Sequence, residues 1–152
     1  MITNIDDNFG KLTKTLESLD LIDNTILIFT TDNGTSNGYK FNKKENKWYG
    51  YNAEMKGTKT SEYDGGHRVP FIMQWKKGGF TTGKTFSGLS AHVDILPTLA
   101  SLAGVDFIPT KTIDGINLSS FLRSNEAPER MLVTDTQRNQ WPEKGKQRSV
   151  LY

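Results

Sequence analysis

Two adjacent polar side chains, Asp32 and Asn33, follow directly after the apolar run TILIFTT at residues 25–31. A carboxylate beside an amide carbonyl suits a hard cation such as Ca²⁺ or Mg²⁺, because these ions prefer oxygen ligands. A turn is the alternative interpretation, since Asp, Asn and Gly are common turn residues. A Ca²⁺ shell holds about six to eight oxygens, so other groups would have to complete it. The pattern therefore predicts either part of a metal site or a turn.

A second polar segment, MKGTKTSEYDGGHRVP at residues 55–70, contains Lys56, Lys59 and the pair His67–Arg68. Cationic side chains on a flexible, glycine-containing backbone favour an oxyanion such as sulfate or phosphate. A lysine there acts as a point charge that stabilises negative charge developing on a reacting oxygen. A solvated basic loop is the alternative interpretation of this segment.

The elements expected around these residues indicate an α/β layer fold. Apolar residues recur with helical spacing from Ile5 to Leu19, and the apolar run 25–31 is typical of a strand buried in a parallel sheet. Residues 34–66 show no periodicity and predict a long functional loop. Ligands of such folds bind at the carboxyl ends of strands, where Asp32 and Asn33 are expected. The remaining elements are expected as a strand at 69–75, a helix at 94–104, a short helix within 116–124 and a strand at 131–136.

The composition indicates a globular domain and excludes several classes of function. The chain has 152 residues, of which 35% are hydrophobic and 24% charged. Its 19 basic and 17 acidic residues are too balanced to predict nucleic-acid binding. The absence of cysteine excludes disulfides, thiolate metal sites and cysteine nucleophiles. No apolar run approaches the roughly 20 residues of a membrane span.

Four segments together resemble the sulfatase family of the alkaline phosphatase-like superfamily. They are NTILIFTTDNG, NAEMKGTKTSEYDGGHRVPFIMQW, LSAHVDILPTLASLAG and DGINLSSFL, in this order over essentially the whole chain. The resemblance implies an active-site divalent cation, normally Ca²⁺ with Mg²⁺ as the alternative, bound by Asp32 and Asn33. It places the catalytic lysine at Lys59, which contacts the sulfate and stabilises the leaving oxygen. Lys56 takes the place of the family's arginine.

The lysine segment departs from the family pattern at three positions. Thr58 and Thr60 replace glycines on either side of Lys59, and Asp64 replaces the usual glutamate. None of these changes removes the charge that binds an anion. They predict an altered loop conformation, because glycine reaches backbone angles that threonine avoids.

Two histidines have alternative roles. His67 occupies a position where many sulfatases carry His-Arg-Val-Pro, and it is expected either to contact substrate or to serve a structural or surface role. His92 is expected to contribute to packing, and its neighbour Asp94 is expected to cap the start of a helix.

The family's nucleophile is a formylglycine made from Cys or Ser in a Cys/Ser-x-Pro-x-Arg motif. The chain's Pro-x-Arg lies in EAPER at residues 126–130, with Glu126 at the nucleophile position. The early acidic pair of metal ligands is also absent. We therefore expect residues 1–152 to be the C-terminal part of a catalytic domain whose N-terminal strands are missing, with a tail from about residue 137 leading toward an absent small subdomain. We expect this chain alone to be inactive.

The predicted function of the parent enzyme is hydrolysis of sulfate esters on a small molecule or a glycan. A periplasmic or secreted location would fit the parent family, with any export signal preceding residue 1. Two alternatives stay open: a phosphoester or phosphonate hydrolase of the same superfamily, and a non-catalytic remnant that binds an anion or a sugar.

Overall fold

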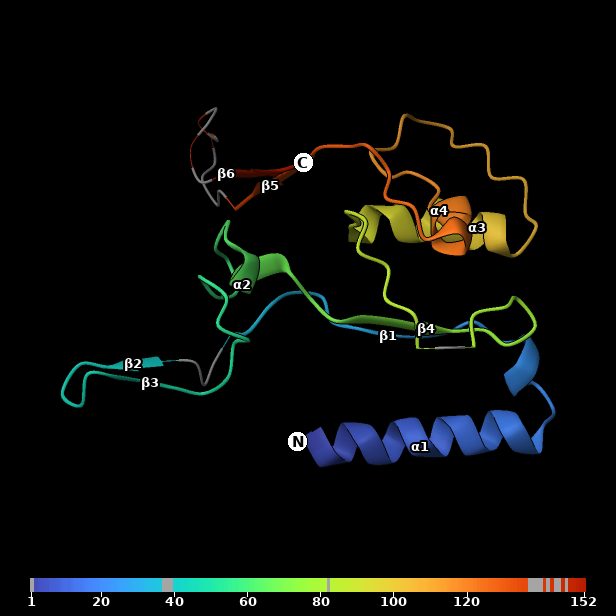
Figure 1. Cartoon of the computed structure of the whole chain (residues 1–152), viewed down its shortest axis with the longest axis horizontal. Coiled ribbons are helices and arrows are strands. Elements are labelled where there is room, and N and C mark those ends of the chain that lie inside the picture. Colours follow the sequence, from blue (N-terminus) through green and yellow to red (C-terminus); the bar gives the residue numbers. More distant parts are fainter. Residues whose placement is uncertain are drawn as a thin grey trace. The chain divides into compact units, whose positions relative to one another are not determined.

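The computed structural model describes residues 2–36, 40–81, 83–136, 141, 143, 146 and 148–152. The chain divides into two compact units. Unit 1 comprises Met1–Thr30 and Pro70–Lys84, and unit 2 comprises Thr31–Val69 and Thr85–Tyr152. Figure 1 shows the elements of both units in chain order.

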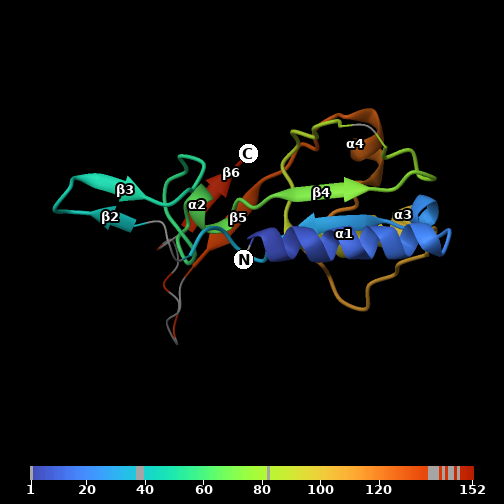
Figure 2. The same ribbon diagram turned by 90° about the horizontal axis from the view of Figure 1, so that it is seen from below.

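Unit 1 contains one long helix and a two-stranded sheet. The predicted amphipathic helix is confirmed as α1 (Ile2–Ser18), and a 3₁₀ turn (Ile22–Asn24) leads into β1 (Leu27–Thr30). Helix α1 runs alongside β1 in the opposite direction (Figure 2). Its apolar stripe meets the strand where the ring of Phe9 packs edge-on against Phe29, with centroids 6.1 Å apart.

The pairing of β1 corrects the predicted parallel sheet. Strand β1 pairs antiparallel with β4 (Phe71–Gln74), so that Leu27 faces Gln74 and Thr30 faces Phe71. A parallel pair requires a crossover that returns the chain to the opposite end of the first strand. Here the chain leaves β1 at Thr30 and re-enters beside it at Phe71, so the second strand must run backwards. Strand β1 is also only half-buried.

Unit 2 contains the predicted helices near residues 94–104 and 116–124, and both predictions are confirmed. A 3₁₀ turn (His92–Asp94) leads into α3 (Ile95–Leu102), and α4 spans Ser119–Ser124. Leu102 and Leu118 are buried, at 8% and 5% exposed. The Thr98 hydroxyl on α3 accepts a hydrogen bond from the backbone N–H of Leu118 at 2.9 Å. This bond attaches α3 to the start of α4.

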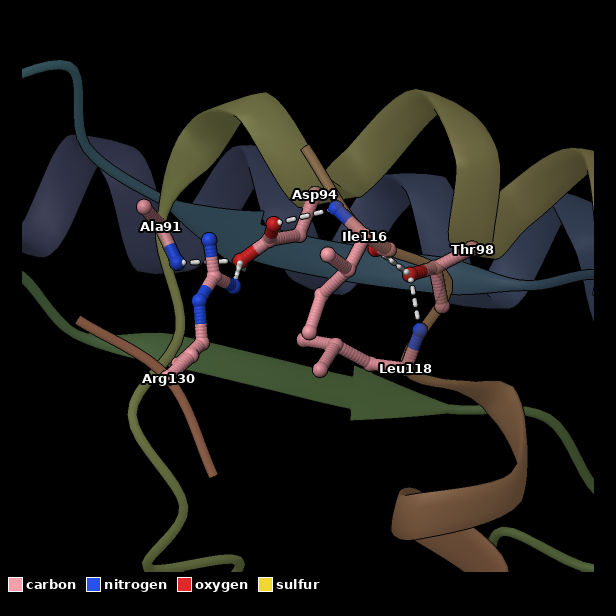
Figure 3. A network of polar contacts seen from close by, with 6 residues as sticks. All are labelled: Ala91, Asp94, Thr98, Ile116, Leu118 and Arg130. Atoms are coloured by element: carbon pink, nitrogen blue, oxygen red, sulfur yellow. Dashed lines mark hydrogen bonds and ion pairs between the residues drawn. The ribbon is translucent and has the colours of Figure 1, made fainter. Parts of the chain in front are cut away.

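Asp94 is the polar centre of this part of unit 2 (Figure 3). The residue is 2% exposed, and its carboxylate accepts hydrogen bonds from the backbone N–H groups of Ala91 at 2.7 Å and Ile116 at 2.9 Å. The guanidinium of Arg130, whose side chain is 9% exposed, lies 2.7 Å from the same carboxylate. The predicted cap is confirmed only in part: Asp94 makes no side-chain cap bond to α3, but its carboxylate accepts from the Ala91 N–H at the start of the preceding 3₁₀ turn. The same carboxylate joins two distant segments.

The predicted loop at 34–66 contains secondary structure that the sequence did not reveal. Strands β2 (Lys40–Asn42) and β3 (Lys47–Tyr49) form an antiparallel hairpin, and a single helical turn, α2, spans Asp64–His67. Strands of three residues are too short to show an alternating pattern. Sequence periodicity could therefore not predict this hairpin, which is recognised only by its cross-strand pairing.

The predicted strand near 131–136 is confirmed as β5 (Leu132–Asp135). A further strand, β6 (Arg148–Leu151), returns along it antiparallel and places the Arg148 guanidinium 2.5 Å from the Asp135 carboxylate. The start of the predicted tail, residues 137–140, lies outside the described residues. Among the described helices, none is long and apolar enough to cross a membrane.

Candidate functional site

The first part of the candidate site is the aspartate loop, residues 31–36, which follows β1. The Thr31 hydroxyl donates to the carbonyl of Asn33 at 3.2 Å, and the Asn33 side-chain Nδ2 donates to the carbonyl of Gly34 at 2.9 Å. These bonds leave the Asn33 Oδ1 and the exposed Asp32 carboxylate without a donor among the described residues. Both predicted metal ligands thus present oxygens that the described part of the protein does not use.

A histidine from unit 2 attaches the start of this loop. The Nε2 of His92 donates to the carbonyl of Thr31 at 2.9 Å. His92 is exposed, so the predicted packing role is replaced by a hydrogen bond to the residue before Asp32. The 3₁₀ turn that carries His92 is stabilised by the hydrogen bond from the Ala91 N–H to the buried Asp94 carboxylate.

The second part is the lysine loop, residues 55–60, and two backbone hydrogen bonds join its segment to the aspartate loop. The N–H of Lys59 donates to the carbonyl of Thr35 at 2.7 Å, and the N–H of Gly34 donates to the carbonyl of Gly66 at 3.0 Å. A Cβ at Gly34 would lie 2.1 Å from the Gly65 oxygen, so this close approach requires glycine. The structure therefore brings together the two segments that carry Asp32, Asn33 and Lys59.

The two lysines of the loop have different surroundings. The Lys56 ammonium lies 3.6 Å from the ring centroid of Tyr63, a cation–π contact that orients the side chain. The Lys59 side chain is exposed and has no partner in the described ranges. Of the two, Lys59 carries the charge available to an anion.

The two threonines that replace family glycines behave differently. Thr60 has φ of 79°, in the left-handed region where a β-branched residue is strained, whereas Thr58 does not have a positive φ. Of the two threonines, only Thr60 therefore affects the loop as expected: its backbone adopts a φ typical of glycine despite the β-branched side chain.

His67 and Arg68 make contacts within their own segment. The Nε2 of the half-buried His67 donates to the carbonyl of Glu62 at 3.1 Å. The Arg68 guanidinium lies 3.5 Å from the Asp64 carboxylate, one helical turn away. These contacts support the structural role for His67, and substrate contact stays a prediction.

The predicted metal site stays a prediction. The carboxylate and amide oxygens of Asp32 and Asn33 fit a hard cation chemically. Within the described ranges, however, no group of three or more His, Cys, Asp or Glu residues could hold a metal ion. A cation bound by Asp32 and Asn33 would therefore need further ligands from other groups.

Comparison with known proteins decides the family. The model of the Sulfatase family matches residues 1–105, a range that includes Asp32, Asn33, Lys59 and His67. The chain belongs to the sulfatase family. Human steryl-sulfatase is 31% identical over 121 residues, which cover 80% of this sulfatase chain and 20% of the relative. The chain thus spans about a fifth of the length of the curated relatives it matches.

Two solved structures share the fold of this chain. The crystal structure of Ps i-CgsB in complex with k-i-k-neocarrahexaose has a TM-score of 0.76 and 31% identity, covering 91% of this chain and 29% of that one. The structure of BT4656 in complex with its substrate D-glucosamine-2-N,6-O-disulfate has a TM-score of 0.66 and 26% identity, covering 92% and 26%. The predicted alkaline phosphatase-like α/β class is confirmed.

One residue of the site was overlooked in the sequence. Asn52 is 3% exposed and donates two hydrogen bonds to the lysine loop of this sulfatase chain. Its signal is an asparagine three residues before Met55 in a glycine-containing segment, because asparagine side chains commonly bond to nearby backbone in turns. That signal is weak, since polar loops contain many asparagines.

Proposed function

We propose that this chain forms the cation-and-lysine part of the active site of a sulfuric ester hydrolase. In this proposal Asp32 and Asn33 hold a divalent cation, Ca²⁺ or Mg²⁺, and Lys59 binds the sulfate. The observation that supports it is the pair of backbone hydrogen bonds, Lys59 to Thr35 and Gly34 to Gly66, that ties the lysine loop to the aspartate loop.

Each residue has a defined chemical task. When bound, the cation draws electron density from the sulfate oxygens as a Lewis acid. The Asp32 and Asn33 oxygens, which have no donor among the described residues, would hold the cation, and the exposed Lys59 ammonium neutralises charge that develops on the ester oxygen as the S–O bond breaks. Lys56, held over Tyr63, adds a second positive charge to the loop. In this proposal the nucleophile comes from outside these 152 residues.

Sulfated glycans are the proposed substrate class. Two of the solved structures most similar to this chain contain, by their titles, a neocarrahexaose and a disulfated glucosamine. The human relative is a steryl-sulfatase, so a sulfate ester is the broader proposal for the substrate and a sulfated glycan is the narrower one.

The test is hydrolysis of a chromogenic aryl sulfate by the protein that carries this segment, with and without Ca²⁺. Asp32→Ala is expected to abolish the dependence on Ca²⁺ and to lower activity by about 100-fold or more, as loss of a site that stabilises charge in the transition state does. Asp106→Ala removes an equally exposed carboxylate and should leave activity unchanged. Equal activity of the two variants would contradict the proposal.

A non-catalytic role is the second candidate, because no Cys/Ser-x-Pro-x-Arg motif occurs in these 152 residues. Calorimetry of the chain with Ca²⁺ and a sulfated sugar separates the candidates. The binding role would be favoured if the sugar binds in a cation-dependent way and the protein that carries this segment still shows no turnover. Turnover of a phosphomonoester in preference to an aryl sulfate would instead favour a phosphoester hydrolase.

A further inference from the structure

Asn52 lies beneath the lysine loop and is 3% exposed. Its side-chain Nδ2 donates to the carbonyl of Met55 at 2.9 Å and to the carbonyl of Gly57 at 2.7 Å. These two carbonyls flank Lys56, so a single amide group fixes the backbone on both sides of that residue. A side chain that donates twice to one turn restrains the turn more than either bond alone.

The carbonyl between them is also bonded. The N–H of Gly65 donates to the carbonyl of Lys56 at 2.8 Å. A Cβ at Gly65 would lie 2.1 Å from the Gly57 oxygen and 2.7 Å from the Asn52 Nδ2, so the three segments pack in direct contact. Three consecutive carbonyls, from Met55 to Gly57, are therefore held by groups outside the loop.

The chain has few free torsions between this anchored turn and Lys59. Lys59 follows Gly57 by two residues, and its own N–H donates to Thr35 in the aspartate loop. The loop is thus fixed on one side by Asn52 and Gly65, and on the other by Thr35. The position of the Lys59 Cα follows from these two attachments.

The chemistry of this position requires an amide. The Oδ1 of Asn52 is buried and has no donor among the described residues, which destabilises the fold relative to a satisfied group. Leucine would avoid that cost but would leave the Met55 and Gly57 carbonyls without their donor. Aspartate has the same shape but would place a second acceptor against two carbonyl oxygens.

We propose that Asn52 is a positioning residue for the anion site: it holds the lysine loop so that Lys59 faces the sulfate. The anion part of this inference rests on the function proposed above. The attachment of the loop does not, and it can be measured without any ligand.

The first experiment measures amide hydrogen exchange in the 152-residue chain. In Asn52→Leu, the amides of Lys59 and Gly65 are expected to exchange at least about tenfold faster, because local opening of the loop becomes easier. The amides of Leu122 and Asn125 in and after α4 should keep their protection and so report that unit 2 is folded. Asn52→Asp should show the same pattern at similar volume.

The second experiment is a double-mutant cycle on binding of inorganic sulfate, followed by NMR. Asn52→Leu and Lys59→Met are each expected to weaken binding of sulfate. For Asn52→Leu the expected loss of affinity is about tenfold, which corresponds to the loss of two neutral hydrogen bonds. The double variant should bind no more weakly than Lys59→Met alone, because Asn52 acts through Lys59. Asn117→Ala is the control, because it removes an exposed side chain that accepts from the Ser119 N–H. It should cause a local loss of stability but leave the affinity for sulfate unchanged.

The outcomes separate the two proposals. Unchanged exchange at Lys59 and Gly65 in Asn52→Leu overturns the positioning role, and so does an additive cycle. Unfolding of unit 2 in both Asn52 variants would also overturn it, in favour of a general structural role. Faster exchange with no sulfate binding in any variant, the unmodified chain included, would keep the attachment and refute the anion site.

Discussion

Lys59 is the residue on which the proposed chemistry depends most directly. Its ammonium is exposed and without a partner among the described residues, whereas Lys56 is held over Tyr63. Lys59→Met keeps most of the length of the unbranched side chain and removes the charge. In the protein that carries this segment, we expect kcat to fall by about 10²–10³, the usual cost of losing one group that stabilises transition-state charge.

Aryl-sulfate kinetics measure this effect, with Lys84→Met as the control because Lys84 is equally exposed and lies in the other unit. A Lys59→Met enzyme with wild-type kcat would show that another group faces the ester oxygen.

Thr60 allows a prediction of stability at the scale of one residue. Its φ of 79° is unfavourable for a β-branched side chain, by about 1–2 kcal/mol. Glycine removes this strain but raises the entropy of the unfolded chain. Thr60→Gly is therefore expected to increase the free energy of unfolding by about 0.5–1 kcal/mol, measured by urea denaturation.

Thr58 is the matched control, since it lies on the other side of Lys59 without a positive φ. Thr58→Gly should destabilise the protein by about 0.5–1 kcal/mol. The same sign of change in both variants would mean that backbone strain at Thr60 is not the cause.

At the scale of an element, the β2–β3 hairpin carries a pH-dependent contact. The Tyr49 hydroxyl donates to the Glu45 carboxylate, and this hydrogen bond, with a smaller effect of burial, raises the pKa of Tyr49 above its ordinary value. The folded hairpin thus holds the proton more tightly than the unfolded chain. Its stabilisation is complete below the ordinary tyrosine pKa of about 10 and is lost as the pH rises through the raised value.

Titration of the Tyr49 ring carbons by NMR checks this prediction. Glu45→Ala should lower the pKa of Tyr49 toward its ordinary value, because the largest cause of the shift is removed. Glu54→Ala, which removes an exposed acid with no bond to Tyr49, should leave the titration unchanged. Identical titrations in the two variants would show that Glu45 is not the acceptor.

At the scale of the molecule, the Asp94–Arg130 pair joins distant parts of unit 2. Arg130→Met leaves the Asp94 carboxylate buried and without its cation, a loss that typically costs about 3–5 kcal/mol. Lys76→Met breaks the exposed Lys76–Asp23 pair in unit 1 and is expected to cost at most about 1 kcal/mol.

Hydrogen exchange of the α3 amides resolves the effect by unit, because the chain folds into two compact parts. Loss of α3 protection in Arg130→Met but not in Lys76→Met is the expected result. Similar small effects in both variants would show that the buried pair adds little to the stability of unit 2.

The sequence by itself determined the family, helices α1, α3 and α4, and the chemical character of the site. The apolar residues of α1 repeat with a helical period that is visible without a structure, because burial of one helix face is a local property of the chain. The adjacent oxygens of Asp32 and Asn33 and the charge of Lys59 are likewise properties of residue type. The predicted roles of these three residues at a metal and a sulfate stay predictions.

The tertiary structure decided how these groups are arranged. The antiparallel pairing of β1 with β4 depends on where the chain returns after about 40 residues. The two backbone bonds between the aspartate and lysine loops, and the burial of Asn52 beneath Met55 and Gly57, depend on segments that are distant or aperiodic in sequence. Local pattern reports which face of an element is buried, but it carries no information on which partner covers that face, and so these contacts became visible only in the fold.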